Sequence, residues 1–285
     1  MKLVSKSELA DSLLSLGIGL GDIVHVQSDL RRIGPVDAHL TREDLCEFYL
    51  STLQSVVGPE GTLTVCTAFE DYGRYGTAFV REESPSRTDM FSEYLRTRPG
   101  AHRSMHPIVS VAGLGARAAE ICNGSHYEGF GYQSAWGRLH RANAKILTLG
   151  MGADLGGTTF FHYVERLYGV PYVYTKLFTY PVFAEGRQIQ GPFTMSVRYL
   201  DFNIVNTPVK VKNSMLIAGK ARQSSTGRAL SWCAAAEDIV EHMMSLLDRD
   251  RWAMLEKPPK FRPGVLPMDG QTGDMQVWYD MSDQK

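Results

Sequence analysis

Residues 19–34 read GLGDIVHVQSDLRRIG, a short apolar segment enclosed by two glycine-bearing turns. β-Branched residues alternate with other types in Asp22–Gln27, which is typical of a strand. Before it, residues 5–16 place leucines on one helical face, and after it Thr41–Val57 predicts a second helix. Leu63–Thr67 predicts the next strand. Helices and strands therefore alternate across short turns, which is the pattern of a layered α/β sheet.

The rest of the chain continues this alternation. Helices are expected over residues 91–98, 116–123, 159–168 and 234–247, and strands over residues 108–112 and 145–149. Antiparallel strands are expected within residues 170–212, in VPYVYTKLF, YPVFAEGRQIQGPFTMSVR and PVKVKN, with a hairpin turn at Glu185-Gly186. Residues 70–89 and 124–134 read as loops. The predicted fold class is α/β, a layered mixed β-sheet with flanking helices and an antiparallel C-terminal β portion.

We find no sign of a domain boundary before residue 255, so residues 1–255 are expected to form a single domain. From Glu256 onward, prolines and glycines become frequent and the hydrophobic periodicity fades. Residues 256–285 are therefore expected to form an extended or partly disordered arm.

The composition of the 285 residues narrows the possible partners. The net charge is −1, whereas a general binder of nucleic acids or anionic membranes needs an excess of basic residues. No apolar run approaches the roughly 20 residues that span a bilayer. Four separate cysteines stand in apolar company and form no CxxC pair. Reduced core cysteines, and a cytoplasmic location, are the expectation.

Two motifs suggest ligands but fail on inspection. Gly113–Gly115 and Gly150–Gly152 follow predicted strands, but no acid-ended strand comes about 20 residues later, as a dinucleotide site requires. His102 and His106 have the i, i+4 spacing of metal ligands, but flanking prolines interrupt any helix there. We expect tight turns and a loop stabilised by imidazole hydrogen bonds, and no metal. A nicotinamide-dependent oxidoreductase remains as an alternative that uses the glycine turns.

The strongest constellation is TTFFHYVE, residues 158–165. On a helix, His162 and Glu165 lie on one face, where the carboxylate can orient the imidazole. An oriented imidazole can accept a proton from an amine that attacks an acyl carbon. A histidine on an apolar helix is otherwise most often a packed core residue.

With its neighbours, this motif resembles the aminoglycoside 3-N-acetyltransferase family of acetyl-CoA-dependent enzymes. The resemblance covers about residues 7–245. It is carried in order by GLGDIVHVQSDLRRIG (19–34), VGPEGTLTVCT (57–67), EYLRTRPGAHRSMHPIVS (93–110), the segment 129–139, the Thr-x-x-His-x-x-Glu motif (159–165) and VPYVYTKLF (170–178).

The resemblance implies acyl transfer from a coenzyme A thioester to an amine. It makes His162 the general base, and Glu165 the residue that orients it or contacts the amine. The co-substrate is expected to be acetyl-CoA or another short-chain acyl-CoA. Loop N–H groups after the first strand could hold its pyrophosphate, and arginines could meet its phosphates. The expected coenzyme contacts are Ser28, Asp29, Leu30, Arg31, Gly34, Arg103, Ser104 and Ser110.

For the acceptor we favour the amine of an amino sugar, nucleotide-linked, over an aminoglycoside antibiotic as in resistance. The second alternative is a non-catalytic sugar- or nucleotide-binding protein on the same scaffold. The expected substrate contacts are Glu70, Asp71, Tyr72, Trp136 and Thr159. Association of the chain with itself is left open.

The chain departs from the family pattern at two positions. Gln27 replaces a common histidine, and Ala135 replaces a common proline. A side-chain contact at Gln27 and the shape of the acceptor side are expected to differ accordingly.

Overall fold

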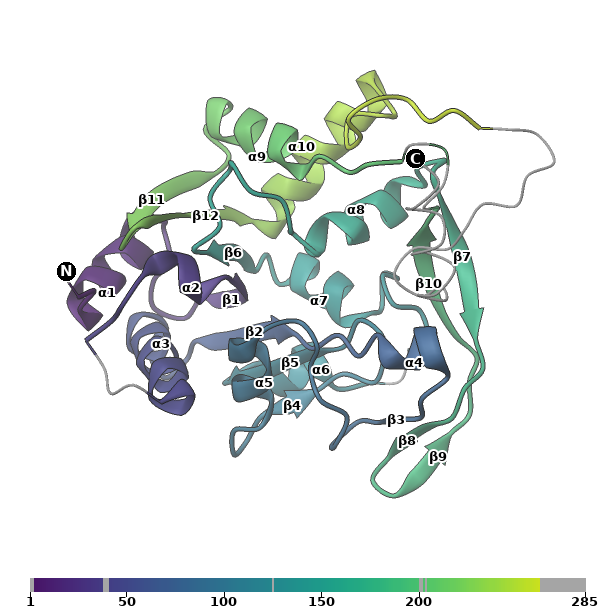
Figure 1. Ribbon diagram of the computed structural model, residues 1–285, viewed down its shortest axis with the longest axis horizontal. Helices are drawn as coiled ribbons and strands as arrows, with labels where there is room; N and C mark the ends of the chain where they lie inside the picture. Colours follow the sequence, from purple (N-terminus) through teal and green to yellow (C-terminus); the bar gives the residue numbers. More distant parts are fainter. Residues whose placement is uncertain (1–2, 38–40, 125, 200–201, 203, 262–285) are drawn as a thin grey trace, which may run out of the picture.

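Strand β1 (Ile23–Ser28) lies at the centre of a seven-stranded mixed sheet in the computed structural model, which describes residues 3–37, 41–124, 126–199, 202 and 204–261 (Figure 1). The strand order is β11-β12-β6-β1-β2-β5-β4. The other strands are β2 (Thr62–Cys66), β4 (His102–Arg103), β5 (Val111–Gly115), β6 (Lys145–Leu149), β11 (Arg222–Thr226) and β12 (Ala229–Ala235). The predicted layered mixed sheet is confirmed.

The three central strands run parallel. β1 pairs with β2 on one side and with β6 on the other, so their carboxyl ends reach the same edge of the sheet. The flanking strands β5 and β12 are antiparallel to this core. Ligand sites of open α/β sheets lie at such a carboxyl edge, which here brings Gln27 and Cys66 together.

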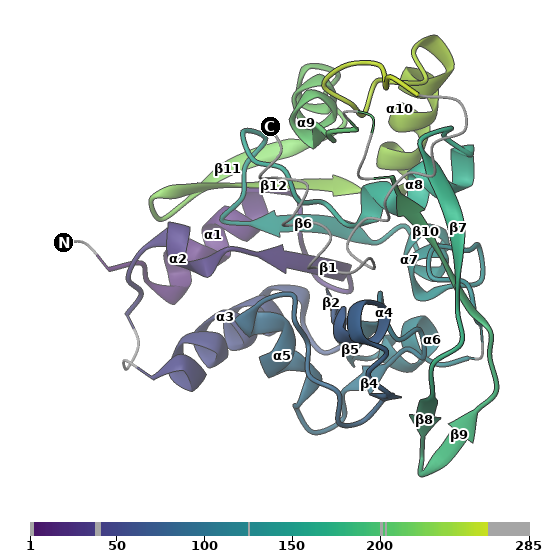
Figure 2. The same cartoon turned by 45° about the vertical axis from the view of Figure 1, so that its right-hand side comes forward.

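Helices cover both faces of the sheet (Figures 1 and 2). Val24 and Val26 pack in one core with α1 (Lys6–Ser15), α3 (Arg42–Val57) and α5 (Met90–Arg96). Ile23, on the opposite face of β1, belongs to a second core. That core includes side chains of α6 (Ala118–Cys122), α7 (Ala135–Arg141), α8 (Phe160–Tyr168) and α10 (Ala236–Arg249).

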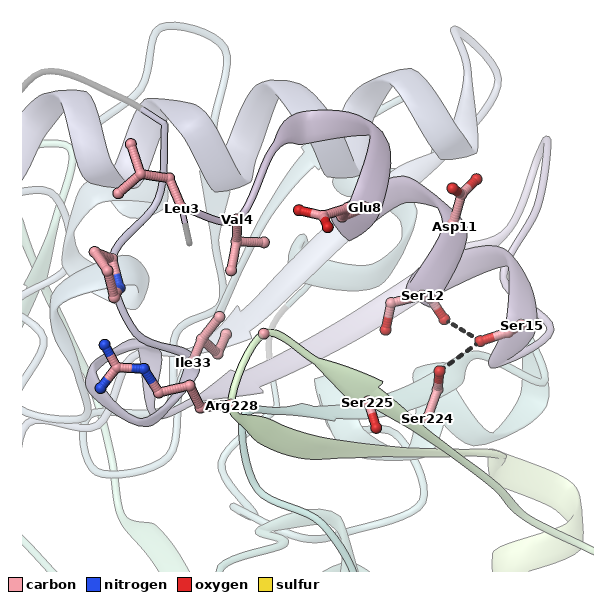
Figure 3. A pocket seen from close by; sticks show the side chains of 12 residues that line it. Leu3, Val4, Glu8, Asp11, Ser12, Ser15, Ile33, Ser224, Ser225 and Arg228 are labelled. Atoms are coloured by element: carbon pink, nitrogen blue, oxygen red, sulfur yellow. Dashed lines mark hydrogen bonds between the residues drawn. The ribbon is translucent and has the colours of Figure 1, made fainter. Parts of the chain in front are cut away.

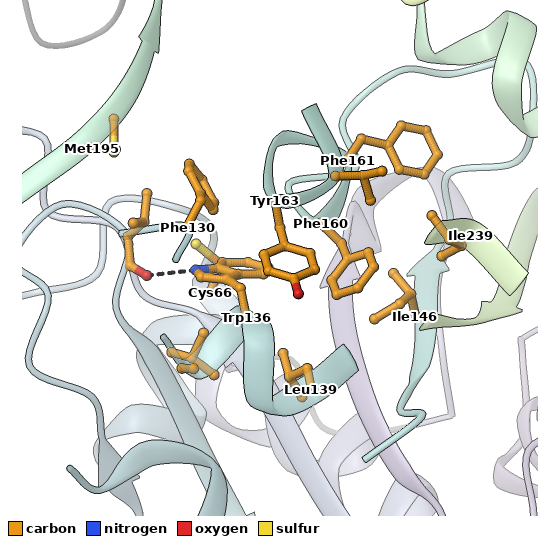
Figure 4. Packing of buried hydrophobic residues seen from close by; sticks show 14 of the residues in the cluster. Cys66, Phe130, Trp136, Leu139, Ile146, Phe160, Phe161, Tyr163, Met195 and Ile239 are labelled. Atoms are coloured by element: carbon orange, nitrogen blue, oxygen red, sulfur yellow. Dashed lines mark hydrogen bonds between the residues drawn. The ribbon is translucent and has the colours of Figure 1, made fainter. Parts of the chain in front are cut away.

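The second core holds α8 in place. Phe160 and Tyr163 project from α8 into the cluster that contains Trp136 and Ile146 (Figure 4). All four side chains are buried. Truncating a buried phenylalanine of this kind typically costs about 3–5 kcal/mol, so the packing fixes the helix that carries His162.

An antiparallel arm follows α8. β7 (Val173–Phe178) pairs with β10 (Phe193–Arg198), and β8 (Val182–Ala184) pairs with β9 (Arg187–Ile189) and with β3 (Phe79–Val80). Glu185 and Gly186 form the predicted hairpin turn, with φ of 51° and 69°. Two successive positive φ angles match the twist that a two-residue hairpin requires.

Several elements differ from the predictions. PVKVKN is wrong as a strand, because residues 208–217 form α9 (Pro208–Ile217). Pro208 at the helix start has its φ preset for a helix, and Val211 and Met215 are buried one turn apart. The segment PVKVKN has only two apolar–polar alternations, which is too few to distinguish a strand from a helix.

Three further regions were incompletely predicted. The 70–89 loop contains α4 (Asp71–Tyr75) and β3, and the strand expected at 108–112 begins at Val111. The strands β11 and β12 were missed, as was α7, and the short α2 (Leu30–Ile33) stands in the predicted turn.

The start of the predicted C-terminal arm packs onto the domain. The N–H groups of Glu256 and Lys260 donate to the carbonyls of Val205 (2.9 Å) and Phe202 (3.0 Å). The Phe261 ring lies 5.5 Å from the Phe202 ring. Residues 262–285 of the predicted arm lie outside the described residues.

Candidate active site

A cavity of about 510 Å³ opens at the carboxyl edge of the parallel strands. Gln27 of β1 and Cys66 of β2 line it from the sheet, and residues 156–159, Phe161 and His162 line it from the start of α8. The end of β10 and the segment before α9 form a further wall. His162 and Glu165 both line this cavity, so the predicted catalytic pair lies where the fold places a ligand site.

His162 and Glu165 form a close pair on one face of α8. His162 Nδ1 lies 2.6 Å from Glu165 Oε2. The imidazole is 45% exposed, whereas the carboxylate is 2% exposed. A carboxylate oxygen accepts, so Nδ1 carries the proton and donates it. This arrangement leaves Nε2 of His162 with its lone pair available to the cavity.

Glu165 is held from its other side by Tyr172. The Tyr172 hydroxyl donates to Glu165 Oε1 over 2.8 Å, and both side chains are buried. Burial and the neighbouring carboxylate raise the pKa of Tyr172, so the hydroxyl stays a donor. The two oxygens of this buried carboxylate thus have one partner each, which offsets the cost of its desolvation.

Gln27 anchors the first turn of α8. Its Oε1 accepts from the Thr159 backbone N–H (3.1 Å) and from the Thr159 hydroxyl (3.3 Å). No side chain of its own caps α8, so the end of β1 supplies an acceptor to one of its unpaired N–H groups. The departure noted at Gln27 therefore ties α8 to the central strand. Ala135, the other departure, is buried at the start of α7 and does not line the cavity.

The predicted coenzyme turn lies next to the cavity but does not line it, apart from the preceding Gln27. The Ser28 N–H donates to the Asp89 carboxylate, and the Asp29 N–H donates to the Leu149 carbonyl over 3.0 Å. Leu30 is buried, and the Arg31 side chain is 92% exposed with Asp29 as its partner at 3.3 Å.

A second cavity begins at the other end of this turn. It has a volume of about 630 Å³ and is lined by Ile33, Pro35 and Arg228 among others (Figure 3). Gly34 stands between Ile33 and Pro35 with a φ of 97°. The turn of residues 28–34 therefore runs from one cavity to the other.

The structure does not bring Arg103, Ser104 and Ser110 to either cavity. The Arg103 guanidinium donates to Ser110 Oγ (3.1 Å) and to the Thr67 carbonyl (2.9 Å), and also to the carbonyls of Arg81 (3.1 Å) and Ser84 (2.5 Å). Ser104 Oγ accepts from the Val111 N–H over 2.9 Å. These side chains join β4, β5 and the 81–84 segment, so we do not keep them as coenzyme contacts.

The predicted substrate contacts divide into two groups. Glu70 and Thr159 line the cavity, and Asp71 pairs with Arg87 (2.8 Å), which lines it. Tyr72 and Trp136 are fully buried instead. Their polar atoms bond to the carbonyls of Tyr180 and Val109 (2.9 Å each), so neither is available to a substrate.

Sequence reasoning missed the cavity residues that come from distant segments. They are Arg87, Thr88, Ser196, Arg198 and Asn206. The only signal was the strict alternation in FTMSVR of β10, where Thr194, Ser196 and Arg198 share the less buried face.

The motifs that were set aside have structural explanations. His106 is buried, with Nε2 donating to the Thr194 carbonyl (3.0 Å) and Nδ1 accepting from the N–H groups of Ile108 and Val109 (3.3 Å each). This confirms a loop stabilised by imidazole hydrogen bonds. A Cβ at Gly150 would stand 2.5 Å from the Asp29 carbonyl oxygen, so close packing explains this glycine.

The described part of the chain contains no group of three or more His, Cys, Asp or Glu side chains that could hold a metal. None of its helices has the length and apolar character to cross a bilayer.

Solved structures share this fold. The chain superposes on the aminoglycoside acetyltransferase AAC(3)-Xa with a TM-score of 0.74 and 25% identity, over 89% of this chain and 95% of that one. It also matches the AAC-IIIb binary complex with CoASH, with a TM-score of 0.74 and 24% identity over 90% of this chain and 100% of that one.

Characterised relatives have matching names. Aminoglycoside N(3)-acetyltransferase VII of Streptomyces paromomycinus is 28% identical over 84% of this chain and 89% of its own length. Aminoglycoside N(3)-acetyltransferase IX of Micromonospora chalcea is also 28% identical, over 86% and 94%. These names support the aminoglycoside alternative better than the nucleotide-linked amino sugar that we favoured from the sequence.

The sequence model of the family described as aminoglycoside 3-N-acetyltransferase matches residues 24–248, most of the chain. The match includes all but one residue of β1 and of α10, and the His162–Glu165 pair. The chain therefore belongs to the aminoglycoside 3-N-acetyltransferase family of acetyl-CoA-dependent N-acetyltransferases, as its motifs predicted.

Proposed function

We propose that this protein transfers an acetyl group from acetyl-CoA to an amine of an aminoglycoside, with His162 as the general base. The observation that carries the proposal is the His162–Glu165 pair at 2.6 Å, with its half-exposed imidazole in a cavity at the carboxyl edge of the sheet. A non-catalytic binding protein would have no use for a buried carboxylate that orients an exposed imidazole. The names of the relatives support the choice of acceptor.

The proton path follows from the tautomer. Glu165 accepts from Nδ1, so Nε2 is the atom that can take a proton. An amine with an ordinary pKa near ~10 is mostly protonated at neutral pH, so one proton must leave before attack and another after it. An imidazole, whose unperturbed pKa is about 6.5, can accept and release protons at neutral pH.

These groups account for every bond and proton of the reaction. The neutral amine nitrogen attacks the thioester carbonyl carbon and forms the new C–N bond. His162 Nε2 takes the proton that the nitrogen loses, the C–S bond breaks, and the proton passes to the thiolate sulfur. The products are the acetamide and free coenzyme A. Positioned base catalysis of this kind contributes about 10²–10⁴-fold.

We further propose that the turn of residues 28–34 holds the coenzyme, because it connects the catalytic cavity to the second cavity. The N–H groups of Leu30 and Arg31 stand in the first turn of α2, so they have no intrahelical partner and can donate to phosphate oxygens. A cytoplasmic location, where acetyl-CoA is present, stays part of the proposal.

The test is a thiol-release assay with acetyl-CoA and a panel of aminoglycosides. We expect His162→Ala to fold normally and to lose about 100-fold or more of kcat/KM. His102→Ala, on the edge strand β4 away from the cavity, should retain wild-type turnover. Near-normal turnover by the folded His162 variant would reject the role. Coenzyme A at millimolar concentration should also raise the melting temperature, and no shift would count against coenzyme binding.

A further inference from the structure

Three side chains of the catalytic cavity carry buried polar atoms without a hydrogen-bond partner. They are Thr158 Oγ1, Arg198 Nε and Asn206 Oδ1. Thr158 is 5% exposed and immediately precedes Thr159 at the start of α8. Within the described residues, Arg198 Nε has no hydrogen-bond partner, although Glu165 and Tyr172 are near enough to influence the guanidinium electrostatically.

These three residues come from segments that meet beside the catalytic pair. Arg198 ends β10, and the next residue donates its N–H to the Tyr172 carbonyl over 3.4 Å. Asn206 lies just before α9, where Pro208 packs within 3.2 Å of the Cβ position of Gly156. The wall next to Glu165 is therefore built from three distant parts of the chain and is polar at each of them.

A buried polar group without a hydrogen-bond partner costs about 1–3 kcal/mol of stability, so native proteins contain few of them. In a ligand cavity the missing partner is ordinarily supplied by the ligand. The three atoms differ in what they can accept. The guanidinium only donates, the amide oxygen only accepts, and the threonine hydroxyl does both.

A hydroxyl group can pair with each of these three kinds of atom, because it both donates and accepts. An ammonium group cannot accept from Arg198, and the guanidinium repels it. A carboxylate or phosphate cannot donate to Asn206 Oδ1. The cavity carboxylates Glu70 and Glu165 already have partners in Arg74, His162 and Tyr172, so neither presents an unpaired negative charge to a second ammonium.

We propose that Thr158, Arg198 and Asn206 form a subsite for the hydroxyl groups of the acceptor sugar, which selects an acceptor that presents hydroxyls rather than a second amine to this wall. The inference deepens the proposed function. It rests on that function in one respect, because it requires the amine acceptor to bind in this cavity. The acceptor class is thus a polyhydroxylated amino sugar that is oriented by its hydroxyls as well as by its reacting amine.

The test uses two matched pairs of probes. Paromomycin and neomycin B differ by a hydroxyl or an amine at one ring position, and so do kanamycin A and kanamycin B. Binding is measured by titration calorimetry with coenzyme A present, for the wild type, Arg198→Gln and Asn206→Asp. Hydrogen bonds to charged groups support roughly tenfold discrimination. We expect the wild type to prefer the hydroxyl member of at least one pair by about tenfold. Arg198→Gln should bring that ratio toward one, and Asn206→Asp should bring it to one or invert it.

Arg187→Gln is the matched control, because it removes an exposed arginine in β9 that does not line the cavity. Its ratio should equal that of the wild type. Thermal unfolding of each variant checks that it is folded. Equal ratios in the wild type and in both cavity variants, for both pairs, would overturn the subsite. The proposed function fails separately, if the wild type releases no thiol with any aminoglycoside, since calorimetry reads the subsite without turnover.

Discussion

The edge of the sheet around Arg103 and the cavity wall around Arg198 bury the same kind of side chain for opposite purposes. Burial lowers the pKa of both arginines. Arg103 donates to Ser110 just before β5, to Thr67 just after β2 and to the 81–84 segment. Among the described residues, Arg198 Nε has no partner. A saturated guanidinium holds segments together, whereas we propose that the unsaturated one in the cavity meets a ligand. Burial alone therefore does not separate the two roles.

The largest effect should come from breaking the saturated region. Arg103→Met leaves several buried carbonyls without donors, so we expect a loss of about 3 kcal/mol in the free energy of unfolding. Urea unfolding measures it, with Arg187→Met as the exposed control. A stable Arg103 variant with weakened coenzyme A affinity would restore the sequence-based prediction that Arg103 binds the coenzyme.

The buried histidines give the next effect, through pH. Burial lowers the pKa of His25 and of His106 to about 3, from an ordinary value of 6.5. Between these values the unfolded chain binds more protons than the folded one, so stability falls as pH drops from 6.5 toward 3. The slope for each histidine reaches about 1.4 kcal/mol per pH unit.

Urea unfolding at several pH values between 6.5 and 4.5 measures this slope, and His106→Gln should lower it by about one proton. An unchanged slope in the variant would show that His106 takes up its proton without unfolding.

The smallest effect should come from the Tyr172 hydroxyl. Tyr172→Phe leaves Glu165 Oε1 without its donor while the His162 contact remains, so we expect kcat to fall about 3- to 10-fold with KM for acetyl-CoA unchanged. Steady-state thiol release separates the two constants. Tyr163→Phe is the control, because this buried hydroxyl bonds His140 at 3.0 Å and does not touch the pair. Equal kcat values for the two variants would show that the Tyr172 hydroxyl does not support the His162–Glu165 pair.

The sequence predicted what local spacing determines. The central strands and the helix with His162 and Glu165 on one face follow from periodicity, because both residues lie within one turn. That the three central strands run parallel was not predicted. Arg103 and Arg198 could not be told apart, since their roles depend on acceptors brought from elsewhere in the chain. Tyr72 and Trp136 were misread for the same reason, because aromatic residues in a loop segment give no sign of whether they pack inward.

The most direct test of the central claim is rescue of His162→Ala by added imidazole in the thiol-release assay. If His162 acts as the base, the folded variant should be about 100-fold slower than the wild type, and imidazole should restore thiol release in proportion to its concentration. A folded variant that turns over at the wild-type rate, with no response to imidazole, would contradict the account.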